Sequence, residues 1–225
     1  MHIHHTVKKI QPYWVGIVLL LPYLYLCYLM VEICLQYFPW QDDCNFLLLK
    51  QDVVQTQPWR LAFQIHVIAS SFLLIAGFTQ FFAIFRRTHP KIHKFSGYLY
   101  ISVLLGFALP SGFVLALSAA GGWMTQLCFI ILSLLWGFTT FTAVQKARQK
   151  KWLQHRDWMI RSFALSLSAL SLRSWKILLY ELQPYFDFLT PVHIYQLEAW
   201  LGWSINLLIA EWIIFKLHQQ KYKSL

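Results

Sequence analysis

The sequence predicts an all-α fold: a polytopic integral membrane bundle of about six transmembrane helices that forms a single domain over residues 1–225. Composition is the first reason, because 58% of the 225 residues are hydrophobic, only 12% are charged and the mean hydropathy is +0.49. One soluble core could not bury this much apolar surface. Spacing is the second reason. Apolar windows of roughly 20 residues, enough to cross a bilayer, recur at 13–36, 61–85, 97–119, 123–146, 158–180 and 193–217.

The first window could be a signal peptide or a retained helix, because it is an apolar segment that follows Lys8 and Lys9. It is longer than the apolar region of such a peptide, carries Glu32 and lacks a small-x-small cleavage site. We therefore expect residues 13–36 to form a retained helix. The third and fourth windows are joined by the uncharged run 119–122, Ala-Ala-Gly-Gly, which predicts a tight helical hairpin.

Basic residues follow the connectors and set the topology. With six crossings, one side of the membrane carries Lys8, Lys9, Arg86, Arg87, Lys91, Lys94, Lys146, Arg148, Lys150, Lys151, Arg156, Arg161, Lys216, Lys221 and Lys223. The other side carries Lys50, Arg60 and most of the acidic loop residues. We expect the chain to lie in the cell (inner) membrane, and the positive-inside rule then places both termini in the cytoplasm. The net charge of +10 forms no single basic face, so lipid and not nucleic acid is the expected partner.

Four histidines lie at the ends of apolar windows, where histidine is costly in lipid but useful as a ligand. His66 and His193 begin inward-running segments and should share the outer level. His93 and His155 begin outward-running segments and should share the cytoplasmic level. The sequence alone does not decide whether the members of each pair face one another.

Helical phase places polar residues on the same faces as these histidines. His66 and Gln80 fall on one stripe of mostly small or polar residues. Arg173 follows His155 by five whole turns, or roughly 27 Å of rise, so we expect it at the outer level. Glu211 follows His193 at the same spacing and should reach the cytoplasmic level, where it could pair with Arg161 or with the histidines of that level. Each intramembrane charge needs a partner or a wet cavity.

Several spaced motifs carry a family resemblance: HPKIHKFSGYLY at 89–100, HRDWMIRS at 155–162, Ala164-Leu165, Leu172-Arg173, WSINL at 203–207 and Ala210-Glu211. Together they resemble the bacterial membrane-protein family called domain of unknown function 2306, over about residues 60 to 215. Residues 13–36 and the outer loop 37–60 are peripheral to that core. The resemblance implies the fold and the importance of these positions, Asn206 among them, but supplies no reaction and no catalytic residue.

A weaker similarity concerns the histidines. His93-Lys94 followed by Gly97 is similar to the start of a haem-carrying helix in ferric reductase and NADPH oxidase membrane domains. Ascorbate-dependent b-type cytochromes likewise use four helix-borne histidines as two haem pairs. By resemblance, His66 with His193 and His93 with His155 would ligate two b-type haems, and Arg173 would hold a propionate. The sequence departs from those families because His93 and His155 lie at the membrane edge and no ascorbate or flavin motif is present.

Two functional hypotheses follow. The first is a haem b electron-transfer protein that works with quinone or another redox partner. The second is a non-redox protein, with a transport or proton path through its polar interior or a structural role in a membrane complex. Interfacial histidines are often only solvated, and helical cysteines usually pack as small apolar residues. The chain has no CxxC motif and no Gly-rich phosphate loop, so neither a zinc site nor a nucleotide site is indicated.

Overall fold

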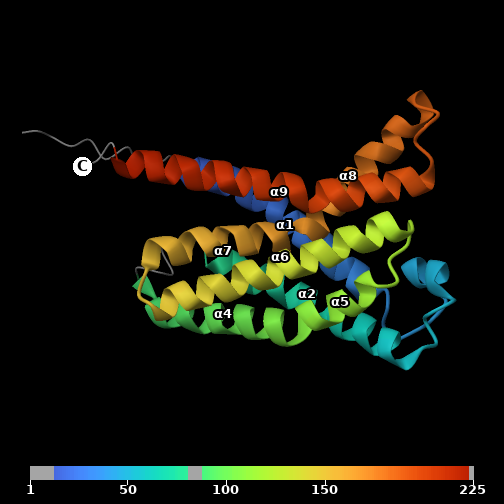
Figure 1. The fold of residues 1–225 in the computed structure, drawn as a ribbon, viewed down its shortest axis with the longest axis horizontal. Helices are drawn as coiled ribbons and strands as arrows, with labels where there is room; N and C mark the ends of the chain where they lie inside the picture. Colours follow the sequence, from blue (N-terminus) through green and yellow to red (C-terminus); the bar gives the residue numbers. More distant parts are fainter. Residues whose placement is uncertain (1–12, 81–87, 223–225) are drawn as a thin grey trace, which may run out of the picture.

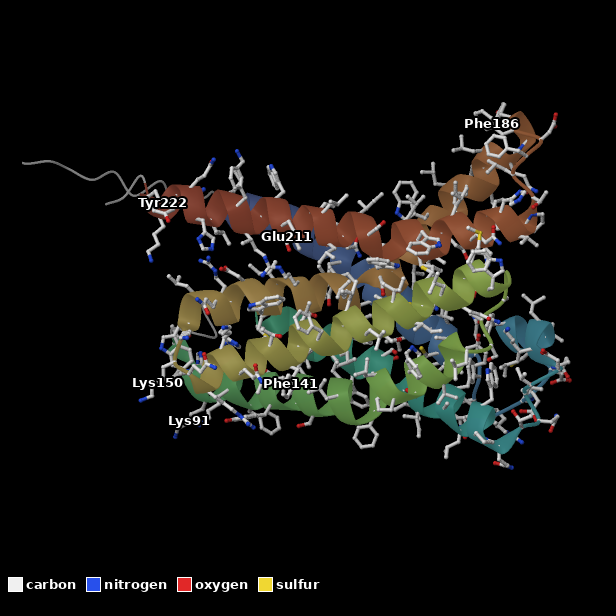
Figure 2. The ribbon with its side chains drawn as sticks, viewed as in Figure 1. Lys91, Phe141, Lys150, Phe186, Glu211 and Tyr222 are labelled. Atoms are coloured by element: carbon white, nitrogen blue, oxygen red, sulfur yellow. The ribbon has the colours of Figure 1, made fainter. Side chains whose placement is uncertain are left out.

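A computed structural model describes residues 13–80 and 88–222. Within them the regular structure is helical, and successive segments run back and forth between two ends of an elongated bundle (Figure 1). We call one of them the loop end; it carries the segment 36–56, the turn 117–122 and the connection 183–190. The opposite end carries the exposed side chains of Lys91 and Lys150 and the last turn of the chain's final helix (Figure 2). We call this second end the basic end.

The first half of the chain supplies α1 (Tyr13–Leu35), the short 3-10 helix η1 (Asn45–Lys50) and α2 (Gln57–Thr79). Next come α4 (Pro90–Val103), a π-helical turn η2 (Leu104–Ala108) and α5 (Leu109–Ala116), which follow one another without a loop. Pro110 is the second residue of α5, close behind the π turn. Because proline has no backbone N–H to give, the irregular turn lies where the regular hydrogen-bond ladder is interrupted.

The second half supplies α6 (Trp123–Arg148), α7 (Trp152–Ser166), α8 (Ser168–Leu182), the short η3 (Gln183–Tyr185) and α9 (Pro191–Tyr222). The turn before α6 is the predicted hairpin, and both of its glycines have positive φ, +83° at Gly121 and +80° at Gly122. Residues that carry a Cβ rarely adopt a positive φ, which explains why both positions are glycine.

Among the described residues, four segments are long and apolar enough to cross a membrane: residues 57–77, 90–116, 123–148 and 191–222. They confirm the prediction of an all-α, multi-pass membrane protein. In α1 the segment Leu21–Leu35 is also apolar, but it is shorter than these four. Residues 81–85 of the second predicted window lie outside the described residues, as do Lys8, Lys9, Arg86, Arg87 and Lys223.

One sequence prediction is wrong: the window 158–180 is not a continuous helix. It is split between α7 and α8 at Leu167. Asn206 of α9 bridges the break, because its Nδ2 donates to the Ala164 carbonyl (3.2 Å) and its Oδ1 accepts from the Ser171 hydroxyl (2.9 Å). In lipid a carbonyl that has lost its hydrogen bond within the helix needs another donor. The Asn206 amide supplies that donor and so stabilises the break.

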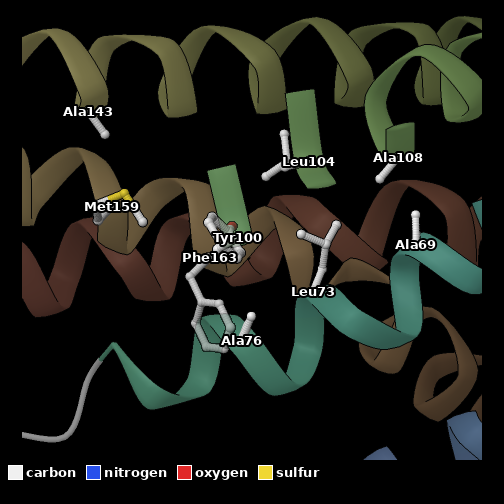
Figure 3. Close-up of a cluster of buried hydrophobic side chains, with 9 residues drawn as sticks. All are labelled: Ala69, Leu73, Ala76, Tyr100, Leu104, Ala108, Ala143, Met159 and Phe163. Carbon is white, nitrogen blue, oxygen red and sulfur yellow. The ribbon is translucent and has the colours of Figure 1, made fainter. Parts of the chain in front are cut away.

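The core packs small residues against one fully buried tyrosine. Tyr100 lies among Leu73, Leu104 and Phe163, and alanines from α2, η2 and α6 allow close approach of these helices (Figure 3). The Tyr100 hydroxyl contacts the hydroxyl oxygens of Ser162 (3.0 Å) and Ser166 (2.6 Å), so the polar end of this side chain is satisfied inside the bundle.

Candidate functional site

A cavity of about 440 Å³ lies toward the loop end of the bundle. Side chains from α1, η1, α2, α5, α6, α8 and α9 line it. Much of the wall is apolar or aromatic, and it includes Met30, Ile33, Phe46, Phe63, Leu73, Leu74, Phe129, Leu132 and Trp136. A cavity of this size with an apolar wall is suited to a small organic ligand.

Three cationic side chains interrupt the apolar wall: Lys50 of η1 and Arg173 and Lys176 of α8. Arg173 is half-buried and donates from Nη1 to the carbonyl of Ala169 in its own helix (2.8 Å). Its guanidinium has five N–H donors, so this contact leaves most of its donor capacity for other groups. Lys176 is exposed, one turn nearer the loop end.

Lys50 comes from the 37–60 segment, which therefore takes part in the site. Its residue is only 6% exposed, and its ammonium donates to the Ser118 carbonyl. Trp59 Nε1 donates to the Ser118 hydroxyl oxygen (2.7 Å), so two side chains fasten this segment and the start of α2 to the turn after α5. Burial lowers the pKa of Lys50, because desolvation penalises the charged form.

One carboxylate faces the same cavity. Glu198 of α9 is 1% exposed and lines the cavity, with Tyr195 and Gly202 on the same side of the helix. Among the described residues its Oε2 atom has no hydrogen-bond partner. Buried carboxylates are usually paired, so this atom marks a place where a donor is missing.

His66 also lines the cavity, beside the π turn. Its Nδ1 lies 3.1 Å from the carbonyl oxygen of Ala108 and 3.4 Å from the Ser111 hydroxyl oxygen. Since a carbonyl only accepts, we assign the proton to Nδ1 and the lone pair to Nε2. A Cβ on Gly112 would lie 3.0 Å from the His66 ring, so glycine there makes room for the imidazole.

His66 and Arg173, two of the predicted ligand-site residues, thus line one cavity. His193 does not line it: this residue is exposed, and its Nδ1 lies 2.6 Å from the Phe188 carbonyl oxygen. At the basic end, His155 places its Nδ1 2.8 Å from the Ala143 carbonyl oxygen, and His93 is half-buried in the first turns of α4. The part of the chain that the structure describes contains no group of three or more His, Cys, Asp or Glu side chains arranged to hold a metal ion.

The other predicted polar residues join helices to one another outside the cavity. Arg161 and Glu211 form a two-pronged ion pair between α7 and α9, at 2.5 and 2.8 Å, as the sequence suggested. In Figure 2, Glu211 lies on the side of α9 that faces α7. Gln80 donates to the Ser96 hydroxyl (2.5 Å) and so links the end of α2 to α4. Asn206 bridges the break at Leu167.

Sequence reasoning missed Glu198 and Lys50. Glu198 is five residues from His193 and does not share the helix face of His193 and Glu211, although the spacing Tyr195, Glu198, Gly202 identifies the face that lines the cavity. Lys50 lies in a loop, where a lone lysine is normally solvated. Nothing in the local sequence predicts that it folds inward.

The class of protein follows from its long apolar helices, which enclose a cavity and are joined by an ion pair between α7 and α9. This is a multi-pass helical membrane protein. The chain belongs to the predicted membrane protein family DUF2306, whose match covers residues 63–214 and confirms the resemblance noted in the sequence. No curated protein matches the chain, and no solved structure does.

Proposed function

We propose that this protein is a non-redox membrane protein that binds an amphipathic organic anion in its cavity and moves it through the bundle. In this proposal α1 and the α7–α8 pair are the two remaining crossings, both termini are cytoplasmic, and the loop end faces outward. The observation that carries the proposal is the meeting of Lys50, Arg173 and Lys176 with an otherwise mostly apolar wall.

The charge balance supports an anionic ligand. Three cations and one carboxylate line the cavity, which leaves a net charge of +2 when all four are ionised and His66 is neutral. Among the described residues no ion pair joins Glu198 to any of these cations. Unpaired charge in a membrane interior costs several kcal/mol, and a phosphate or carboxylate from a ligand offsets that cost while its apolar chain occupies the wall.

Two irregular helices beside the cavity support movement of the ligand. Ala108 and Gly112 border it next to the π turn, and Ser166 and Ser168 border it at the break in α7–α8. Each irregularity has a carbonyl held by a side chain from another helix, Ala108 by His66 and Ala164 by Asn206. Interrupted helices at a binding site are typical of secondary transporters, where they supply ligand contacts and hinges.

Binding is tested with lysophosphatidylglycerol, which has one phosphate charge and one acyl chain, by native mass spectrometry of the purified protein in a non-ionic detergent. We expect saturable binding, and we expect Lys50→Met to weaken it about tenfold through loss of one charged contact. The same change should move the thermal midpoint by less than about 3 °C. The loss of the contact to the Ser118 carbonyl destabilises the protein, and the removal of a charge that burial disfavours offsets this loss.

Lys91→Met is the matched control, since Lys91 is exposed at the basic end. It should bind the lipid like the unchanged protein. Equal affinity in Lys50→Met and Lys91→Met would remove Lys50 from the site. Absence of saturable binding by the unchanged protein would overturn the proposed function itself.

Haem b is the second candidate ligand, and one observation favours it. The proton on His66 Nδ1 is directed to the Ala108 carbonyl, which leaves Nε2 as the ligating atom, the arrangement that metal-bound histidines commonly use. His66 would hold the iron and Arg173 a propionate. Of the two histidines, His66 alone would hold the group here, because His193 lies outside the cavity. A haem bound here would supply one-electron chemistry toward quinone or another redox partner.

A reduced-minus-oxidised spectrum of protein purified from haem-supplied cells tests this second candidate. If haem is bound, His66→Ala should abolish its signal and His193→Ala should leave it intact, because His66 lines the cavity and His193 does not. A folded, colourless protein would contradict haem binding. A signal that is lost with His193→Ala and kept with His66→Ala would move the haem away from the cavity.

A further inference from the structure

The most unusual group in the cavity is the carboxylate of Glu198. Its residue is 1% exposed, and it lines the same cavity as Arg173 and Lys176. A glutamate whose role was to neutralise these cations would form an ion pair with one of them. The described ion pairs of the protein do not include Glu198, and its Oε2 atom is unpartnered among the described residues.

The cations are likewise bonded to groups other than this carboxylate. Arg173 donates to the Ala169 carbonyl and Lys50 to the Ser118 carbonyl. Both carbonyls are neutral, so neither contact cancels a charge. The cavity therefore presents separate positive and negative side chains to its contents, and a purely anionic ligand would leave the Glu198 oxygen without a donor.

We propose that the ligand is zwitterionic: a lipid whose phosphate contacts Arg173 and the two lysines and whose primary ammonium donates to Glu198. A phosphoethanolamine headgroup has this chemistry, with an anionic phosphodiester and an ammonium with three donors a few bonds apart. Its acyl chain would lie along the apolar wall. This inference rests on the proposed function, because it assigns the chemistry of the ligand that occupies the same cavity.

The ammonium and the phosphate of such a headgroup both contribute to its binding. An ammonium that reaches a buried carboxylate gains a charge-assisted hydrogen bond where water is excluded, and such bonds are about twice as strong as neutral ones. A glycerol headgroup offers hydroxyl donors without the positive charge. Discrimination between the two headgroups therefore reports on Glu198, whereas binding of either one reports on the cations.

The test compares lysophosphatidylethanolamine with lysophosphatidylglycerol of the same acyl chain, titrated into the purified protein and followed by native mass spectrometry. We expect the unchanged protein to bind the ethanolamine lipid about tenfold more tightly. In Glu198→Gln the preference should fall to about twofold or less, with binding of the glycerol lipid retained. Glu181→Gln, an exposed glutamate on α8, is the matched control and should keep the preference.

The outcomes separate this inference from the proposed function. Equal binding of the two lipids by the unchanged protein overturns the zwitterion assignment and leaves anion binding standing, and this comparison needs no variant to fold. A preference that survives in folded Glu198→Gln also overturns the assignment. If neither lipid binds saturably, the proposed function fails and the inference with it.

Discussion

Replacement of Arg173 by glutamine is expected to lower the affinity for lysophosphatidylglycerol about 100-fold, the largest loss for any single change at the cavity. Two cations of α8 line the cavity, and Arg173 lies one turn further from the loop end than Lys176. A guanidinium contacts a phosphate through two parallel N–H donors, and an amide cannot reproduce either the charge or this geometry.

The same replacement should leave the empty protein at least as stable. Arg173 is outside every ion pair between described residues, and its hydrogen bond is to the Ala169 carbonyl, one turn back in α8. Its removal therefore breaks no ion pair, and a broken ion pair is the usual reason that loss of a buried charge destabilises a protein. We expect an unchanged or higher thermal midpoint without ligand, measured in detergent by intrinsic fluorescence.

Arg148→Gln provides the control, since Arg148 is exposed in the last turn of α6 at the basic end. Its lipid affinity should equal that of the unchanged protein. A large loss of stability in Arg173→Gln would assign Arg173 a structural role, and unchanged lipid binding would remove it from the ligand site.

Hydropathy predicted the helical, multi-pass fold well because it acts over whole segments. Four predicted windows correspond to long apolar helices, and the Gly121-Gly122 hairpin lies where the turn chemistry placed it. The break at Leu167 escaped prediction because it contains neither proline nor glycine. The donor that stabilises it, Asn206, lies about 40 residues away in another helix, and no local pattern reports such a partner.

The site was predicted only in part, for a related reason. Helical phase placed His66 on a stripe of mostly small or polar residues and Arg173 on the same face as His155, and in the structure His66 and Arg173 line one cavity. The depth argument paired His66 with His193, but equal depth does not bring two side chains together. The Phe188 carbonyl is the partner of His193 in the connection before α9, and the cavity is instead completed by Lys50 and Glu198. Tertiary packing decides which residues of one level meet.

Replacement of Gly202 by valine is expected to destabilise the protein by about 3 kcal/mol, a lowering of the thermal midpoint of about 10 °C. A Cβ at Gly202 would lie 3.1 Å from the Cβ, 3.2 Å from the Cα and 3.2 Å from the N of Leu172. Two of these three atoms belong to the backbone of α8, so a rotamer change cannot relieve the contact. The helices α8 and α9 would have to separate, and the cavity that Gly202 lines would change shape.

Gly106→Val is the matched control for this prediction. Gly106 lies in the π turn, is exposed, and would have no atom within 4 Å of an added Cβ apart from its own helix. An exposed valine here meets no neighbouring helix and so should cost little stability. The thermal midpoint should stay within about 3 °C of that of the unchanged protein. If both variants melt alike, the close α8–α9 contact is not what stabilises this part of the bundle. If only Gly202→Val melts early and its lipid affinity also falls, the spacing of α8 and α9 sets both the stability and the shape of the cavity.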